Sequence, residues 1–169
     1  MNNKCIYFVE GSCEKQLISA LKEAPAKLVP GKIKVFNTVQ NIIPKSQILS
    51  IQSGTMVVLV FDTDVSETTK LKKNIELLKR YCGKIKIIFL AQVLNLEEEL
   101  VRCSDVKVVT ELTKSDSLNN FKTDFCRMKI KDCRLMLKRH NLDCLRLWAT
   151  KVPKHFAFIE NNCSNIKIK

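Results

Sequence analysis

The sequence lacks long apolar runs, paired-cysteine motifs and a Walker-type phosphate-binding loop, and each absence excludes a class of protein. No stretch reaches the roughly 18 consecutive apolar residues of a membrane span, so we expect no membrane partner. The first residues, MNNKCIYFVEG, have no apolar region typical of a signal peptide, which predicts a cytoplasmic protein. Because GxxxxGK[ST] does not occur, any ATPase acting with this chain would be a separate protein.

The cysteines also lack the spacing of a metal site or a disulfide framework. There are eight, and no two form a CxxC pair. Most lie in apolar segments, so we expect buried thiols in a reducing compartment. The remaining composition, 46% apolar and 27% charged over 169 residues, is that of a single folded domain with a sizeable core.

The positive charge is large and unevenly distributed. The formal net charge is +12, and residues 120–169 contain 12 Lys and Arg against four acids, which leaves +4 for the first 119 residues. A basic surface attracts polyanions, so nucleic acid is the predicted partner. An abundance of Lys, Ile and Asn is also typical of an AT-rich genome, so charge alone leaves nucleic-acid binding open.

Apolar periodicity predicts alternating strands and helices followed by a helical tail. Short runs rich in β-forming residues predict strands at 4–9, 32–39, 55–61, 84–91 and 106–112. Apolar residues at helical spacing predict helices at 13–24, 44–51, 66–81, 96–102, 115–129, 131–141 and 142–151. Residues 155–159 fit either an edge strand or a packing segment.

This order predicts an α/β fold with a mostly parallel sheet and helices on both faces. We expect a single domain, 1–169, in which 3–112 form the α/β core and 113–169 a mainly helical, basic C-terminal extension.

The most informative stretch is VLVFDTDVSETTK, residues 58–70, in which an apolar strand runs directly into Asp62 and Asp64. Two carboxylates spaced in this way repel each other unless a cation lies between them. Ligands of parallel sheets bind at the carboxyl ends of the strands. The Asp-x-Asp pair therefore predicts a cation site at that edge of the sheet.

Further acids are predicted to reach the same edge. Glu10 ends the first strand, and Glu14 follows one helical turn later. A run of three glutamates, beginning with Glu97, comes after the fourth strand. Four or five carboxylates would suit Mg²⁺ or Mn²⁺, and Gly11 would allow a sharp turn and the close approach of a phosphate.

The segments VEGSCEKQ (9–16) and VFDTD (60–64) resemble the Glu-Gly and Asp-x-Asp strands of the TOPRIM domain. The resemblance covers roughly residues 3–112. It is closer to small stand-alone TOPRIM nucleases, the OLD-like and RloB-like group associated with phage defence, than to topoisomerases. In that group a second glutamate is expected four residues after the first, which Glu14 matches, and an Asn-x-Glu segment after the fourth strand, which residues 95–97 match.

The resemblance implies metal-dependent hydrolysis of DNA or RNA. Glu10 would be a metal ligand or general acid/base, and Asp62 and Asp64 would bind Mg²⁺ or Mn²⁺. Glu14 and Glu97 would complete one or two metal sites. A lysine of the C-terminal extension, Lys151 or Lys122, would stabilise charge in the transition state. A separate ATPase or defence partner and a homo-oligomer also belong to this hypothesis.

Other hypotheses remain open. Neither Tyr7 nor Tyr81 is placed as the nucleophile of a topoisomerase, and no primase module is visible. FDTDVS also resembles the start of haloacid-dehalogenase phosphatases, but no late acidic pair follows Asp116. A response-regulator receiver would need an acidic pair after the first strand. The main alternative is a non-catalytic module that binds nucleic acid or a partner on a TOPRIM-like scaffold.

Overall fold

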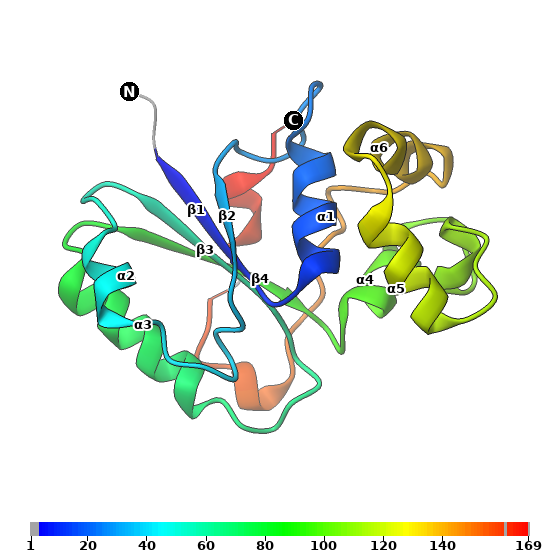
Figure 1. Ribbon diagram of the computed structural model, residues 1–169. Helices are drawn as coiled ribbons and strands as arrows, with labels where there is room; N and C mark the ends of the chain where they lie inside the picture. The colour runs from blue at the N-terminus through cyan, green and yellow to red at the C-terminus, as the bar shows by residue number, and fades with distance from the viewer. Residues whose placement is uncertain (1–3, 161, 169) are drawn as a thin grey trace.

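A four-stranded, all-parallel sheet forms the centre of the molecule in the computed structural model, which describes residues 4–160 and 162–168 (Figure 1). The strands are β1 (Cys5–Val9), β2 (Lys32–Val35), β3 (Met56–Asp62) and β4 (Lys86–Gln92), in the order β2-β1-β3-β4. The predicted α/β fold is therefore confirmed. The central strands β1 and β3 are almost continuously apolar because both of their faces are covered.

Helices cover the two faces in separate groups. On one face α1 (Ser12–Lys22) and α4 (Leu96–Cys103) contact the sheet, and α5 (Leu118–Arg127) and α6 (Ile130–Arg139) extend the same apolar core by packing on α1. The other packs against α2 (Lys45–Leu49) and α3 (Thr69–Tyr81). Successive side chains of β1 point to opposite faces of the sheet. Tyr7 therefore lies in the core beneath α1, and Phe8 lies in the core beneath α2 and α3. Figure 1 shows α4, α5 and α6 beyond the end of β4, beside α1.

The predicted fifth strand at 106–112 is wrong. The segment contains a 3₁₀ helix, η1 (Val109–Leu112). Val106, Val109 and Leu112 are buried at steps of three, while Val108 is 54% exposed. A repeat of three is the period of a 3₁₀ helix, whereas a strand would bury every second residue.

The predicted helix at 142–151 is also wrong, because this segment is a series of turns. The Asp143 carboxylate accepts hydrogen bonds from the backbone N–H groups of Leu145 and Arg146, at 2.9 and 3.3 Å. Trp148 adopts a left-handed backbone with φ of 57°. Asp side chains that bind nearby N–H groups favour turns over helix, and a left-handed residue cannot continue a helix.

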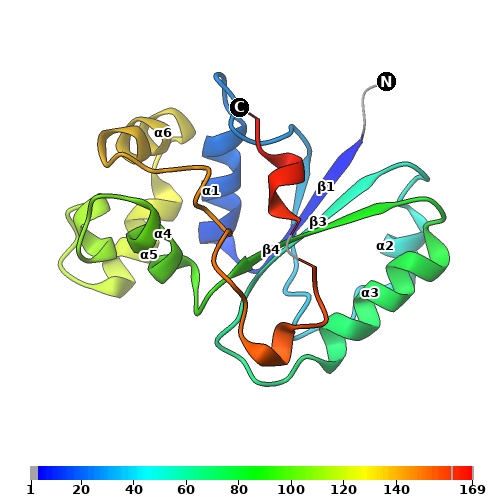
Figure 2. The same ribbon diagram turned by 180° about the vertical axis from the view of Figure 1, so that it is seen from behind.

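The C-terminal segment packs across the side of the sheet that Figure 2 shows. Residues 155–159 are a packing segment: η2 (Lys154–Phe156) buries Phe156, whose ring stacks on Phe61 at 5.6 Å between centroids. Before η3 (Cys163–Ile166), the Asn162 amide accepts from Phe89 N–H at 3.0 Å and donates to the Ile87 carbonyl at 2.9 Å. A side chain thus satisfies backbone groups on the outer edge of β4.

No helix within residues 4–160 and 162–168 is both long enough and apolar enough to cross a lipid bilayer.

Candidate functional site

Parallel strands bring the predicted acids to one edge of the sheet. Glu10 follows β1 directly, and Asp62 is the last residue of β3. Glu14 lies in the first turn of α1, Asp64 follows β3, and Glu97 lies in the first turn of α4, just after β4. All five belong to elements that begin or end at the carboxyl edge, which is where ligands of such sheets bind.

Glu10 is held by the end of β3 and by the turn that follows β2. The backbone N–H of Asp62 donates to Glu10 Oε2 at 3.1 Å, and the Asn37 amide donates to Glu10 Oε1 at 2.6 Å. The Asn37 oxygen in turn accepts from the N–H groups of Val39 and Gln40, at 3.0 and 2.9 Å. Because these bonds fix the orientation of the amide, its N–H₂ group points at Glu10.

Asn37 was missed in the sequence because the strand predicted at 32–39 would have placed it inside the ladder. The structure ends β2 at Val35, which leaves Asn37 in a turn at the carboxyl edge. The available signal was the residue type, since Asn following a β-forming run favours a side-chain-stabilised turn.

Replacing Asn37 should therefore change the titration of Glu10. In Asn37→Ala we expect the Glu10 pKa to rise further, because a hydrogen bond that stabilises the charged carboxylate is removed. We also expect a loss of about 1–2 kcal/mol in unfolding free energy. Carboxyl ¹³C NMR titration measures the pKa, with Gln40→Ala as an exposed control. An unchanged Glu10 titration would contradict the positioning role.

Thr63 fixes the end of β3 relative to α4. Its N–H donates to the Gln92 and Leu94 carbonyls, both at 3.0 Å, and its hydroxyl accepts from the Leu94 N–H at 3.0 Å. Thr63 is buried and lies between the two aspartates, so this network sets where both stand relative to the first turn of α4.

Burial and the neighbouring carboxylates raise the pKa of three members of this group, Asp62, Glu10 and Glu14. Burial, followed by the charges of Glu10, Glu14, Asp64 and Glu97, raises the pKa of Asp62 to about 8. Burial is also the main cause of the raised pKa of Glu10 and of Glu14. The five predicted acids are thus one electrostatic cluster, in which holding every carboxylate charged is unfavourable without a cation.

Glu14 also accepts a hydrogen bond from the backbone of Gly11, and this contact explains why residue 11 is a glycine. The Gly11 N–H donates to Glu14 Oε2 at 2.8 Å, so this side chain caps the start of α1. The Gly11 backbone is extended, with φ of −146°, and contributes no left-handed turn. A β-carbon at position 11 would lie 3.1 Å from Glu14 Oε2, so the glycine leaves room for the carboxylate.

The three consecutive glutamates of α4 have three different environments. Glu97 is half-buried and its Oε1 lies 3.0 Å from Lys122 Nζ. Glu98 is exposed, and Glu99 is fully buried in an ion pair with Arg102 at 2.7 Å. Of the run, Glu97 is the member that joins the acidic cluster, and Glu99 belongs to the core.

Of the two lysines considered, Lys122 lies at the cluster. Its pKa is raised, first by the hydrogen bond with Glu97 and also by the charge of Asp62. Lys151 is exposed in a coil and forms no hydrogen bond or ion pair with the described part of the chain. Lys122 is therefore the cation that this structure places beside the carboxylates.

Two observations fit a divalent cation here. The donor set is all carboxylate oxygen, which Mg²⁺ and Mn²⁺ prefer, and Asp62 Oδ1 is buried without a hydrogen-bond partner. Within 4–160 and 162–168, however, no three or more His, Cys, Asp or Glu side chains are already arranged to hold a metal ion. Binding would therefore require carboxylate side chains to turn inward from their present hydrogen bonds.

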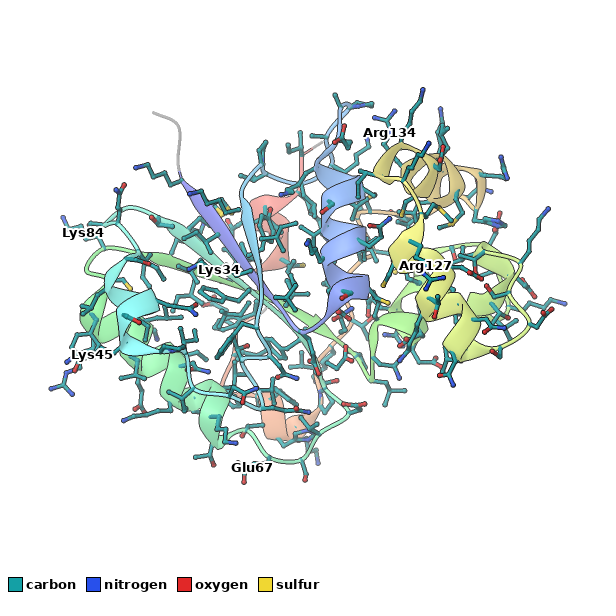
Figure 3. The ribbon with its side chains drawn as sticks, viewed as in Figure 1. Lys34, Lys45, Glu67, Lys84, Arg127 and Arg134 are labelled. Carbon is teal, nitrogen blue, oxygen red and sulfur yellow. The ribbon has the colours of Figure 1, made fainter. Side chains whose placement is uncertain are left out.

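Positive charge is spread over the rest of the molecule. Figure 3 labels Lys34 on β2, Lys45 on α2, Lys84 before β4, Arg127 on α5 and Arg134 on α6, and they lie on different sides of the fold. The acidic edge is the feature that distinguishes one location from the others.

Comparison of the chain with protein-family models, with curated proteins and with solved structures gives no match.

Proposed function

We propose that this protein hydrolyses phosphodiester bonds in nucleic acid with Mg²⁺ or Mn²⁺ at the acidic edge of the sheet. The observation that carries the proposal is the cluster around Asp62, a half-buried carboxylate whose Oδ1 is buried without a hydrogen-bond partner and whose pKa is raised to about 8, in a protein of net charge +12. Perturbed carboxylates at the carboxyl ends of parallel strands are typical of functional sites. The TOPRIM resemblance supports the same chemistry.

Each residue has a role that its surroundings support. Asp62, Asp64, Glu10, Glu14 and Glu97 would hold the cation, which when bound would supply Lewis-acid polarisation of a phosphoryl oxygen. Asn37 and the Asp62 N–H orient Glu10, whose raised pKa favours holding or releasing a proton. Lys122 offers a positive charge toward a phosphate at this edge. A cytoplasmic location belongs to the same proposal, as does a separate ATPase or defence partner.

Mn²⁺ calorimetry tests the proposal, with Asp62→Ala/Asp64→Ala as the variant and Asp116→Ala as an exposed control. We expect wild type and control to bind and the double variant not to bind. At about pH 7.5, binding should release about one proton, because Asp62 is largely protonated before the cation arrives. Repeating the titration in buffers of different ionisation enthalpy measures how many protons are released. Cleavage of single- and double-stranded DNA and RNA should then depend on the same cation.

One observation favours a second function, a non-catalytic module that binds nucleic acid or a protein partner. Hydrogen bonds already engage Glu10 and Glu14, an ion pair engages Glu97, and no ligand set is arranged among the described residues. If wild type binds oligonucleotide but neither Mn²⁺ nor Mg²⁺, even with the oligonucleotide present, the catalytic proposal is wrong and this second function takes its place.

A further inference from the structure

Two thiols from distant parts of the chain meet beside the acidic cluster. Cys13 is the second residue of α1 and Cys126 lies in the last turn of α5. Their sulfur atoms are 3.1 Å apart although 113 positions separate them in sequence. Both side chains are half-buried, so a small reagent has access to them.

The helices that carry these thiols are already packed together. Gln16 of α1 donates to the Met128 carbonyl at the end of α5 at 2.6 Å, and Cys13 Sγ lies 3.8 Å from the Lys122 carbonyl. A disulfide bond is about 2.05 Å long, so the two sulfurs need to approach by only about 1 Å. Small side-chain rotations on a fixed pair of helices could supply that movement.

The other cysteines have different surroundings. Cys5, Cys82, Cys103, Cys133 and Cys163 are buried. Cys144 is half-buried like the pair, but its sulfur contacts the Leu142 carbonyl at 4.0 Å. Cys144 therefore serves as a matched control for reagent access.

We propose that Cys13 and Cys126 form a reversible disulfide that fastens α5 to α1. The oxidant is a low-molecular-weight disulfide such as oxidised glutathione. One protein thiol, as the thiolate, attacks the small disulfide, forms a mixed disulfide and releases one small thiol. The second protein thiol loses its proton and displaces the other small thiol. The protein gains one S–S bond, and one oxidised glutathione becomes two reduced glutathione molecules.

The bond would act on the acidic cluster from two sides. Cys13 directly precedes Glu14, and Lys122 lies one turn before Cys126 with its ammonium on Glu97. Fastening α5 to α1 holds this positive charge beside Glu97, where it competes with a divalent cation for the acidic cluster. This effect rests on the proposed function. We expect the oxidised protein to bind Mn²⁺ at least about fivefold more weakly than the reduced protein.

The experiment equilibrates the full chain in glutathione redox buffers, blocks the remaining thiols and maps the linked peptides. Trypsin and a glutamate-specific protease should yield 123–127 linked to a fragment beginning at Gly11, since cleavage after Glu10 separates Cys5 from Cys13. We expect a mass loss of about two hydrogens, and a melting temperature raised by about 5–10 °C that reduction reverses. Cys144→Ser should behave as wild type, whereas Cys13→Ser and Cys126→Ser should lose the effect.

Failure of this inference and failure of the proposed function give different results. An absent Cys13–Cys126 peptide, or random pairing among the cysteines, overturns the disulfide whatever the protein does with metal. A formed bond with unchanged Mn²⁺ affinity overturns its effect on the site. A formed bond in a protein that binds no Mn²⁺ in either state overturns the proposed function and leaves the disulfide established.

Discussion

The substitution Asp62→Asn is expected to abolish metal-dependent cleavage and, at the same time, to stabilise the metal-free protein near pH 8. An amide keeps the size of the side chain but removes the charge that would bind the cation, so cleavage should fall by at least about 100-fold. The same change removes the repulsion of Glu10, Glu14, Asp64 and Glu97 on a half-buried carboxylate. Function and stability should therefore change in opposite directions.

The pH dependence follows from the raised pKa of Asp62. Its ordinary value is 3.8 and its folded value is about 8, so between these limits the folded protein holds a proton that the unfolded chain lacks. This contribution to stability is fully present below about pH 4 and is lost as the pH rises toward 8. One proton limits the slope to about 1.4 kcal/mol per pH unit.

Urea unfolding of the metal-free protein across this range measures the effect. Wild type should lose stability with rising pH, Asp62→Asn should lose less, and Mg²⁺ should restore stability to wild type alone. Asp116→Asn, an exposed substitution, should follow wild type. Equal pH slopes for wild type and Asp62→Asn would show that Asp62 is not the strained carboxylate.

Glu99→Ala is expected to be the most destabilising single substitution in the acidic run of α4, with a loss of about 3–5 kcal/mol. The Glu99 side chain is fully buried, pairs with Arg102 at 2.7 Å and accepts the Trp148 N–H at 2.5 Å. Its removal would leave the partly buried guanidinium of Arg102 without its counter-charge, with only the Val93 carbonyl as acceptor, and the buried Trp148 N–H without its acceptor. It would also release the left-handed turn at Trp148.

The neighbouring glutamates provide the controls. Glu98→Ala, at an exposed position, should change the unfolding free energy by less than about 0.5 kcal/mol. Glu97→Ala should weaken Mn²⁺ binding with little loss of stability, because its partner Lys122 is exposed. Denaturant unfolding and calorimetry on all three separate the two roles. Similar stability losses for Glu98→Ala and Glu99→Ala would contradict the assignment.

Much of the fold could be predicted because its signals are local. The four strands of the sheet are unbroken β-forming runs, and a turn or helix start directly follows β1 and β3. The carboxyl-edge rule then brought Glu10, Asp62 and Asp64 together without knowledge of the strand order. Glu14 followed from its helical spacing of four residues.

The failures concern residues whose position depends on distant contacts. The turn around Trp148 depends on Glu99, 49 positions earlier, and no pattern within 142–151 reveals that partner. Lys151 was named only as a lysine of the C-terminal extension, and it lies at the end of the segment 142–151, where the predicted helix does not form. Asn37 was hidden by a strand predicted to be four residues too long. At Trp148 and at Asn37, tertiary hydrogen bonds to Glu99 and Glu10 fixed what the local pattern could not.

The two edges of the sheet are protected in different ways, and salt should affect them differently. At β4 the Asn162 amide occupies backbone groups that another strand would need. At β2 the residues include Lys32 and Lys34, whose charges discourage pairing without blocking it. Ions at physiological strength screen charge beyond about 8 Å. Rising ionic strength should therefore favour association of this protein through β2. Association through β4 should instead require local unfolding that removes Asn162 from the strand.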